Sequence, residues 1–479
     1  MNLTKAVQLI RGPKGTEVRL KMVPAGSDSA APNVVTLIRD EIKLEDQEAK
    51  AKVIDLPNTQ GQNGQNLRLG VIDLPSFYAQ FDVGGNRHNE FAGEGAKSAP
   101  KSTTADVARL LKKLKEENVS GIILDLRRNG GGSLEEAIKL TGLFIKEGPV
   151  VQVKNWENKI EEEGDTDPSI AYAGPLIVLT SKFSASASEI LAGALQDYGR
   201  ALIVGDASTH GKGTVQSVNP LSNYLRPPQG SDLRTNDPGA LKLTIKKFYR
   251  ASGVSTQLKG VVPDIILPSV FNESKEVGES ALDNTLACDS IKSANFDRLN
   301  LVAPYLPDLQ KRSAERVSTE REYDYVREDI QQYKKIQADK TVSLNEKQRL
   351  KEKEEIEARQ KARDKERFAR KDPLEKVYEL SLKQCELPGL PPPVEKTNSL
   401  ARVAGADANG SATNLAAVPA GDTPPGLPGE DSEDEKPPVP DASLVEAEHI
   451  LADYVSVLPK DNVLTAAKPD GILDLNRKN

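Results

Sequence analysis

Three short, almost entirely apolar segments recur along the middle of the chain with helical segments between them, and this alternation is the strongest constraint on the fold. The apolar segments are residues 119–126 (VSGIILDL), 175–180 (PLIVLT) and 201–205 (ALIVG). Strands without polar alternation are typical of a sheet that is covered on both faces. Because strands separated by helices need crossover connections, the pattern predicts an α/β domain with a largely parallel central sheet.

Amphipathic helices and one further strand complete this predicted domain. Apolar residues recur at the i, i+3, i+4, i+7 spacing of one helix face at Val107, Leu110, Leu111 and Leu114. Two more helices are predicted at residues 134–146 and 187–198, and residues 67–74 are a strand candidate. A glycine-rich turn at residues 127–132 joins the first buried strand to the next helix.

Composition excludes several classes of function. A length of 479 residues exceeds what one hydrophobic core usually supports, so two or three domains are expected. Two cysteines and three well-separated histidines cannot form a disulfide scaffold or a metal cluster, and we expect neither a metal nor a cofactor. A net charge of -7 argues against a nucleic-acid partner. No apolar run is long enough to predict a transmembrane segment, so the chemistry should use hydroxyls, amines or carboxylates.

The segments on either side of the α/β domain, which we assign to residues 45–270, differ from it in character. Residues 1–44 contain one helix and two strand-like runs, too little to bury a core. Residues 271–385 are dense in Lys, Arg and Glu and predict long solvated helices. Residues 386–441 have the Pro-, Gly- and Ala-rich composition of a disordered linker. Residues 442–458 predict an amphipathic helix that docks back onto the domain.

A serine-rich segment, FSASASEILAGALQD at residues 183–197, lies where a buried strand gives way to a helix. Ser186 and Glu189 fit the S-x-x-E pattern, so one interpretation is that Ser186 only caps the helix. A nucleophile at this position would also have the backbone N–H of Ala187 at the positive end of the helix, where an oxyanion would form. Ser186 is therefore a candidate catalytic residue.

A catalytic serine needs a proton acceptor, and two residues of one glycine-containing loop are candidates. His210 would complete a triad, but the sequence offers no obvious Asp partner for it. Lys212 stands between two glycines shortly after a buried strand, where an isolated charge is unexpected. This amine can accept a proton at neutral pH only if burial lowers its pKa to about 7–8. The alternative interpretation is a solvated turn lysine.

The glycine-rich turn at residues 127–132 (RRNGGG) is the third element of the candidate site. Three successive glycines after a buried strand permit positive φ and a close backbone approach. A plain tight turn would explain them. The functional interpretation is a second oxyanion donor, for which the N–H of Gly132 is the best candidate.

These segments, in this order, resemble a known family. DLRRNGGGSLEEA, SASASEILAGALQDYGRALIVG and HGKGTVQ are similar to the motifs of the carboxy-terminal processing proteases, which are Ser–Lys peptidases, and most resemble the bacterial tail-specific proteases. KFYRASGVSTQLKGVVPDIILPS, the charged helical region and EAEHILADYV extend the resemblance to nearly the whole chain except the linker. It implies a ClpP/crotonase-like α/β serine peptidase core with a mostly parallel sheet. A partial PDZ domain would precede this core, and a charged helical C-terminal domain would follow it.

The resemblance also implies a function and a set of roles. The chain would be a serine endopeptidase that processes or degrades proteins from their C-terminal tails, with no cofactor. Its partners would be substrates with accessible tails and an adaptor lipoprotein, in the periplasm or cell envelope. The implied site residues are the nucleophile Ser186, the base Lys212, the lysine-orienting Gln216, and the oxyanion donors Gly132 and Ala187. Asp197 stands where the family has an acidic residue, to which we assign a structural role.

Two features depart from the family pattern. The loop before Lys212 is one residue longer than in many members, which places His210 close to the base, and we expect this loop to bulge away. Family members carry a signal peptide, an N-terminal helical domain and a complete PDZ domain, so we expect further sequence before Met1. Two other functions stay open: a noncatalytic scaffold that binds tails, and another acyl transfer on a crotonase-like core.

Overall fold

The chain folds into two compact units, residues 1–48 and 49–479. The computed structural model describes residues 9–10, 12, 14–22, 33–40, 48–60, 66–79, 101–221, 224, 239–339, 341, 343–370, 375–394 and 440–459. In the first unit, β1 (Glu17–Met22) pairs antiparallel with β2 (Asn33–Ile38). Two strands do not identify a PDZ domain, so that interpretation stays a prediction. Most of the predicted helix at residues 3–11 lies outside the described residues.

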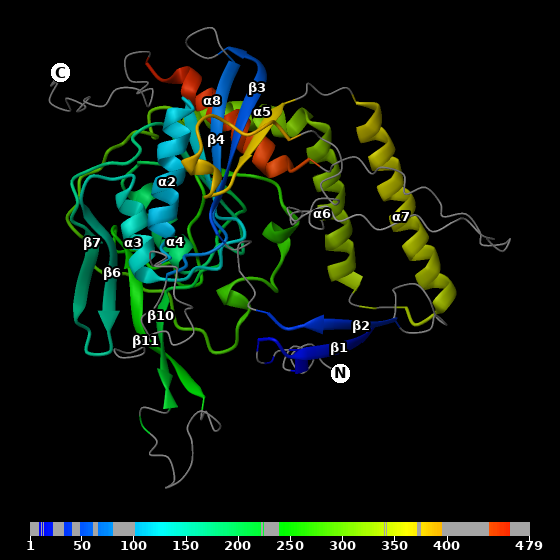
Figure 1. Cartoon of the computed structure of the whole chain (residues 1–479), viewed down its shortest axis with the longest axis horizontal. Helices are drawn as coiled ribbons and strands as arrows, with labels where there is room; N and C mark the ends of the chain where they lie inside the picture. Colours follow the sequence, from blue (N-terminus) through cyan, green and yellow to red (C-terminus); the bar gives the residue numbers. More distant parts are fainter. Residues whose placement is uncertain are drawn as a thin grey trace, which may run out of the picture. The chain divides into compact units, whose positions relative to one another are not determined.

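A seven-stranded sheet forms the centre of the second unit (Figure 1), with strand order β12-β9-β8-β5-β4-β3-β13. Neighbouring strands from β12 to β4 are parallel, and β3 and β13 add an antiparallel edge. The strands are β3 (Lys50–Gln60), β4 (Asn66–Asp73), β5 (Gly121–Asp125), β8 (Leu176–Thr180), β9 (Leu202–Gly205), β12 (Ile265–Ile266) and β13 (Lys376–Leu380). The predicted, mostly parallel α/β core is confirmed.

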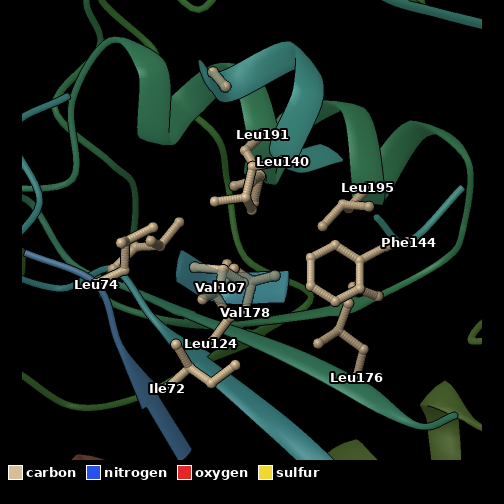
Figure 2. Close-up of a cluster of buried hydrophobic side chains, with 14 of the residues drawn as sticks. Ile72, Leu74, Val107, Leu124, Leu140, Phe144, Leu176, Val178, Leu191 and Leu195 are labelled. Atoms are coloured by element: carbon tan, nitrogen blue, oxygen red, sulfur yellow. The ribbon is translucent and has the colours of Figure 1, made fainter. Parts of the chain in front are cut away.

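Both faces of this sheet are buried, which explains why its strands lack polar alternation. Side chains on one face pack against the helices α2 (Thr103–Glu116), α3 (Leu134–Gly142) and α4 (Ala187–Asp197). Figure 2 shows this cluster, in which Leu124 and Val178 of the sheet face Leu140 and Leu191 of the helices. The intervening residues, such as Ile123, pack on the other face with α5 (Leu306–Thr319) and α8 (Ala442–Val457).

A second, antiparallel sheet lies next to this core, and the apolar pattern predicts it only in part. Its strand order is β10-β11-β6-β7. The strands are β6 (Gly148–Asn155), β7 (Ile160–Asp165), β10 (Thr214–Pro220) and β11 (Ala240–Arg250). Residues 214–220 read as extended, but β7 (IEEEGD) is too acidic and too exposed to stand out as a strand. Because β10 begins two residues after Lys212, this sheet holds one side of the candidate site.

The predicted helical C-terminal region is confirmed. Besides α5, it contains α6 (Arg321–Asp339) and α7 (Glu346–Ala369), which run side by side (Figure 1) and are joined by ion pairs such as Arg367–Glu322 at 2.8 Å. The described residues also form the 3-10 helices η3 (Val270–Glu273), η4 (Glu279–Ala281) and η5 (Gln384–Glu386). Residues 395–439, most of the predicted linker, lie outside the described residues. None of the described helices combines the length and apolar character needed to span a bilayer.

Candidate active site

Ser186 occupies a strained turn between β8 and α4. Its φ is 56° and its ψ is -111°, a conformation that residues with a side chain rarely adopt. Such strain persists only where the surroundings enforce it, and it is concentrated at functional sites. Here the N–H of Ser186 donates to Glu189 Oε2 at 2.8 Å, the return half of the predicted capping box. Ser186 is half-buried at the start of the helix.

Lys212 is held beside this turn by the same carboxylate. Its N–H donates to Glu189 Oε2 at 3.0 Å, so one oxygen atom binds the backbone of both Ser186 and Lys212. The backbone nitrogens of Ser186 and Lys212 therefore lie no farther apart than the combined length of these two hydrogen bonds. Lys212 Nζ donates to Gln216 Oε1 at 3.3 Å, and Gln216 lies near the start of β10. The structure thus brings together three of the residues predicted from the sequence.

The ammonium of Lys212 lies in surroundings that disfavour its charge. Burial is the largest cause that lowers the pKa of Lys212 below its ordinary value, and the positive charge of Lys242 lowers it further. The carboxylates of Glu279 and Glu189 oppose this shift without cancelling it. A lowered pKa increases the fraction of neutral amine near pH 7. A lysine that acts as a base needs its pKa shifted in this direction.

Glu189 is the residue that organises the site, and the sequence revealed it only as a helix cap. Its side chain is completely buried and accepts four hydrogen bonds. Besides the N–H groups of Ser186 and Lys212, it binds Thr209 Oγ1 at 2.6 Å and the N–H of Gly211 at 2.7 Å. One signal was available: Glu189 is an isolated charge in an otherwise apolar helix start, and such a charge must be paired when it is buried.

The pKa of Glu189 gives a pH test of this arrangement. Burial raises it to about 7, although the four donors lower it, whereas its ordinary value is 4.5. A raised pKa stabilises the fold fully below pH 4.5, and this contribution is lost as the pH rises through 7. We therefore expect the unfolding free energy of the wild type, minus that of Glu189→Gln, to fall by about 3 kcal/mol across this range. Urea unfolding of both proteins at several pH values measures this free-energy difference. A difference that grows as the pH rises would contradict the prediction.

The glycine-rich turn, hereafter the glycine loop (residues 127–132), closes over Ser186. Gly131 has a φ of 103°, and a Cβ atom on it would lie 2.9 Å from Ser186 Cβ. Only glycine permits this approach. Asn129 fixes the loop, because its carbonyl accepts from the N–H of Ala185 at 3.0 Å and its side chain accepts from the N–H of Gly131 at 2.9 Å.

Two backbone N–H groups near Ser186 are candidates for oxyanion donors. Within the described part of the chain, the N–H groups of Gly132 and Ala187 donate no hydrogen bond. Ala187 is the first residue of α4, where helix N–H groups carry partial positive charge. Both residues are among the predicted site residues. An oxyanion donor must be free of other hydrogen bonds, so both groups stay candidates for that role.

Asp197 lies at the opposite end of α4 from Ser186. Its carboxylate binds Arg250 at 2.5 Å and accepts from the N–H of Ser252 at 3.1 Å. These contacts tie α4 to β11 and agree with the structural role expected of Asp197.

His210 does not bulge away, and that expectation is wrong. Its N–H donates to the carbonyl of Ser184 at 2.9 Å, and its own carbonyl accepts from the N–H of Glu279 at 2.8 Å. His210 Nδ1 also lies 3.8 Å from Glu279 Oε2, a carboxylate too distant in sequence to be recognised as a partner. His210 and Lys212 line one cleft of about 590 Å³, walled by Thr244 and residues 282–286.

A possible cation site lies elsewhere in the described residues. Glu320, Glu446 and His449 offer ligand atoms within 4.8 Å of one another. Arg316 already binds the carboxylate of Glu446 at 2.9 Å, so a cation would have to displace a guanidinium. The group lies between α5 and α8 and contains none of the predicted site residues.

Comparison with known proteins shows which family the segment that contains these residues resembles. Residues 68–267, which contain the glycine loop, Ser186 and Lys212, match the model of peptidase family S41. These residues therefore form a peptidase S41 domain. Residues 272–456 match the model described as the C-terminal domain of tail specific protease, so the helical region and α8 are part of that domain.

Several curated relatives of this chain are named as proteases. A tail-specific protease of Haemophilus influenzae is 37% identical over 388 residues, covering 79% of this chain and 50% of the relative. A chloroplastic carboxyl-terminal-processing peptidase 2 of Arabidopsis thaliana is 31% identical, covering 62% of this chain and 49% of the relative. A solved photosystem II D1 C-terminal processing protease is 24% identical, with a TM-score of 0.37 and coverage of 56% and 59%. The chain spans about half the length of the two curated relatives.

Proposed function

We propose that this chain is a serine endopeptidase that cleaves proteins from their C-terminal tails with Ser186 as nucleophile and Lys212 as base. The observation that carries the proposal is the buried carboxylate of Glu189, one oxygen of which binds the N–H groups of both residues. The lowered pKa of Lys212 and the available N–H groups of Gly132 and Ala187 support it. The names of the relatives support the C-terminal preference.

The proposed reaction proceeds through an acyl-enzyme. Ser186 Oγ attacks the scissile carbonyl carbon while neutral Lys212 takes the hydroxyl proton, and the carbonyl oxygen becomes an oxyanion bound by Gly132 and Ala187. When the C–N bond breaks, Lys212 gives this proton to the leaving amine. Water then attacks the ester with Lys212 as base, and the proton returns to Ser186 Oγ as the acid is released. Gln216 orients the amine through its hydrogen bond to Nζ.

A pair of protein substrates that differ only in an unstructured C-terminal tail tests this function. We expect the purified chain to cleave the tailed protein and leave the tailless one intact, and Ser186→Ala to cleave neither. Cleavage of both substrates at equal rates would contradict the tail preference. Tail binding by the wild type without cleavage would favour the noncatalytic scaffold instead. The adaptor lipoprotein and the envelope location are proposed on the resemblance alone.

A further inference from the structure

Helix α8 lies against the second face of the central sheet. Its Leu451 packs so closely on β5 that a Cβ atom on Gly121 would lie 2.7 Å from Leu451 Cδ1. Ile123 and Ile177 of the sheet belong to the same buried cluster as Leu451. α8 therefore closes the hydrophobic core on this face, and close packing fixes its position along β5.

The first turn of α8 is bound to the end of β5 by an ion pair. Asp441 caps the helix by accepting from the N–H of Leu444 at 3.1 Å. Both of its carboxylate oxygens also accept from the guanidinium of Arg127, each at 2.7 Å. Burial raises the pKa of Asp441, but the Arg127 hydrogen bonds outweigh it and hold that pKa below its ordinary value. The pair is therefore ionised and bidentate, the strong form of such a contact.

Arg127 is the first residue of the glycine loop, so this ion pair reaches the candidate site. Its guanidinium also binds Asp125 Oδ2 at 2.7 Å, and its carbonyl accepts from Ser181 Oγ at 2.5 Å. Two residues later, the carbonyl of Asn129 binds the N–H of Ala185, the neighbour of Ser186. A displacement of Arg127 would therefore move the loop that carries the proposed oxyanion donor.

We propose that Asp441 is a positioning residue for the glycine loop, acting through Arg127, so that docking of α8 sets the direction of the Gly132 N–H. The catalytic consequence rests on the proposed function, whereas the link between α8 and the loop does not. Asp441 acts on the loop rather than on substrate.

Asp453, near the other end of α8, provides a matched control. Its carboxylate binds Arg316 at 2.6 Å and Arg312 at 3.3 Å, both on α5. It anchors the same helix through the same kind of ion pair, but these contacts are with the helical region rather than the glycine loop. If α8 served only to cover the core, loss of either carboxylate would have the same effect.

The test compares Asp441→Asn and Asp453→Asn in the full chain. We expect Asp441→Asn to lower kcat on the tailed substrate about tenfold with KM unchanged, and to speed amide hydrogen exchange in residues 127–132. Asp453→Asn should lower the Tm to a similar extent but leave kcat and loop exchange unchanged. Asp441→Glu, which keeps the carboxylate, should recover most of the lost kcat.

Equal losses of kcat in the two asparagine variants, or an unchanged loop exchange rate in Asp441→Asn, would overturn the proposal. The exchange measurement also separates this proposal from the proposed function. If the wild type shows no Ser186-dependent cleavage, the proposed function fails. Faster loop exchange in Asp441→Asn alone would still support the link between α8 and the glycine loop.

Discussion

Replacing Lys212 by methionine is expected to lower kcat on a tailed substrate about a thousandfold, with little change in KM. Methionine keeps an apolar stem at this half-buried position but cannot accept the proton of Ser186. The backbone N–H of Lys212, which binds Glu189, is retained, so the loop should keep its place. Steady-state kinetics of the purified variant measures the effect.

Two neighbouring residues provide controls for this prediction. Lys182 Nζ binds Ser208 at 2.8 Å, so Lys182→Met removes a nearby amine that has another partner and should leave kcat unchanged. His210→Asn tests the other base that the cleft offers. Full activity in Lys212→Met together with its loss in His210→Asn would move the role of base to His210 and its partner Glu279.

Replacing Glu189 by alanine is expected to destabilise the fold by about 3 kcal/mol and to lower kcat about a hundredfold. Three backbone N–H groups and the hydroxyl of Thr209 would lose their buried acceptor, and the backbone of Ser186 would lose its link to Lys212. Urea unfolding and steady-state kinetics measure the two effects separately.

Glu136 supplies the matched control for this second prediction. It is also a buried carboxylate, and it accepts from Ser102 Oγ at 2.9 Å and from the N–H of Thr104 at 2.7 Å, where it joins α3 to α2. Glu136→Ala should destabilise the fold to a similar extent while kcat stays within about threefold of the wild type. A similar fall in kcat in both variants would mean that lost stability, rather than the lost link, explains the effect of Glu189→Ala.

The sequence predicted the core because a strand that is buried on both faces must itself consist of apolar residues, which can be read from that segment alone. Three segments would place apolar side chains on both faces of a strand, namely residues 119–126, 175–180 and 201–205. The strands β5, β8 and β9 form in these ranges, within a sheet that is covered on both faces. The helix expected at 442–458 also forms, as α8. Ser186 and Lys212 could be proposed because Ser186 precedes a predicted helix and Lys212 follows a buried strand, whereas Gln216 and Asp197 were proposed from the family resemblance alone.

Contacts between distant segments could not be predicted in this way. Glu189 fits a helix cap, and nothing local indicates that its carboxylate also binds the loop of Lys212, more than twenty residues away. The same applies to the pairing of His210 with Glu279 and of Arg127 with Asp441. β6 and β11 were missed although both carry apolar residues, with Leu241, Leu243 and Ile245 of β11 alternating with polar ones; only their pairing with each other could not be read from either segment alone.

The rate at which a fluorophosphonate labels Ser186, measured against pH, tests the central claim most directly. If the neutral amine of Lys212 activates Ser186, the wild-type rate should rise with pH, with a midpoint below the ordinary lysine value of 10.5. Lys212→Met should label slowly and without that rise, and Ser186→Ala should not label. Identical labelling profiles in the wild type and Lys212→Met would contradict the claim that Lys212 is the base for Ser186.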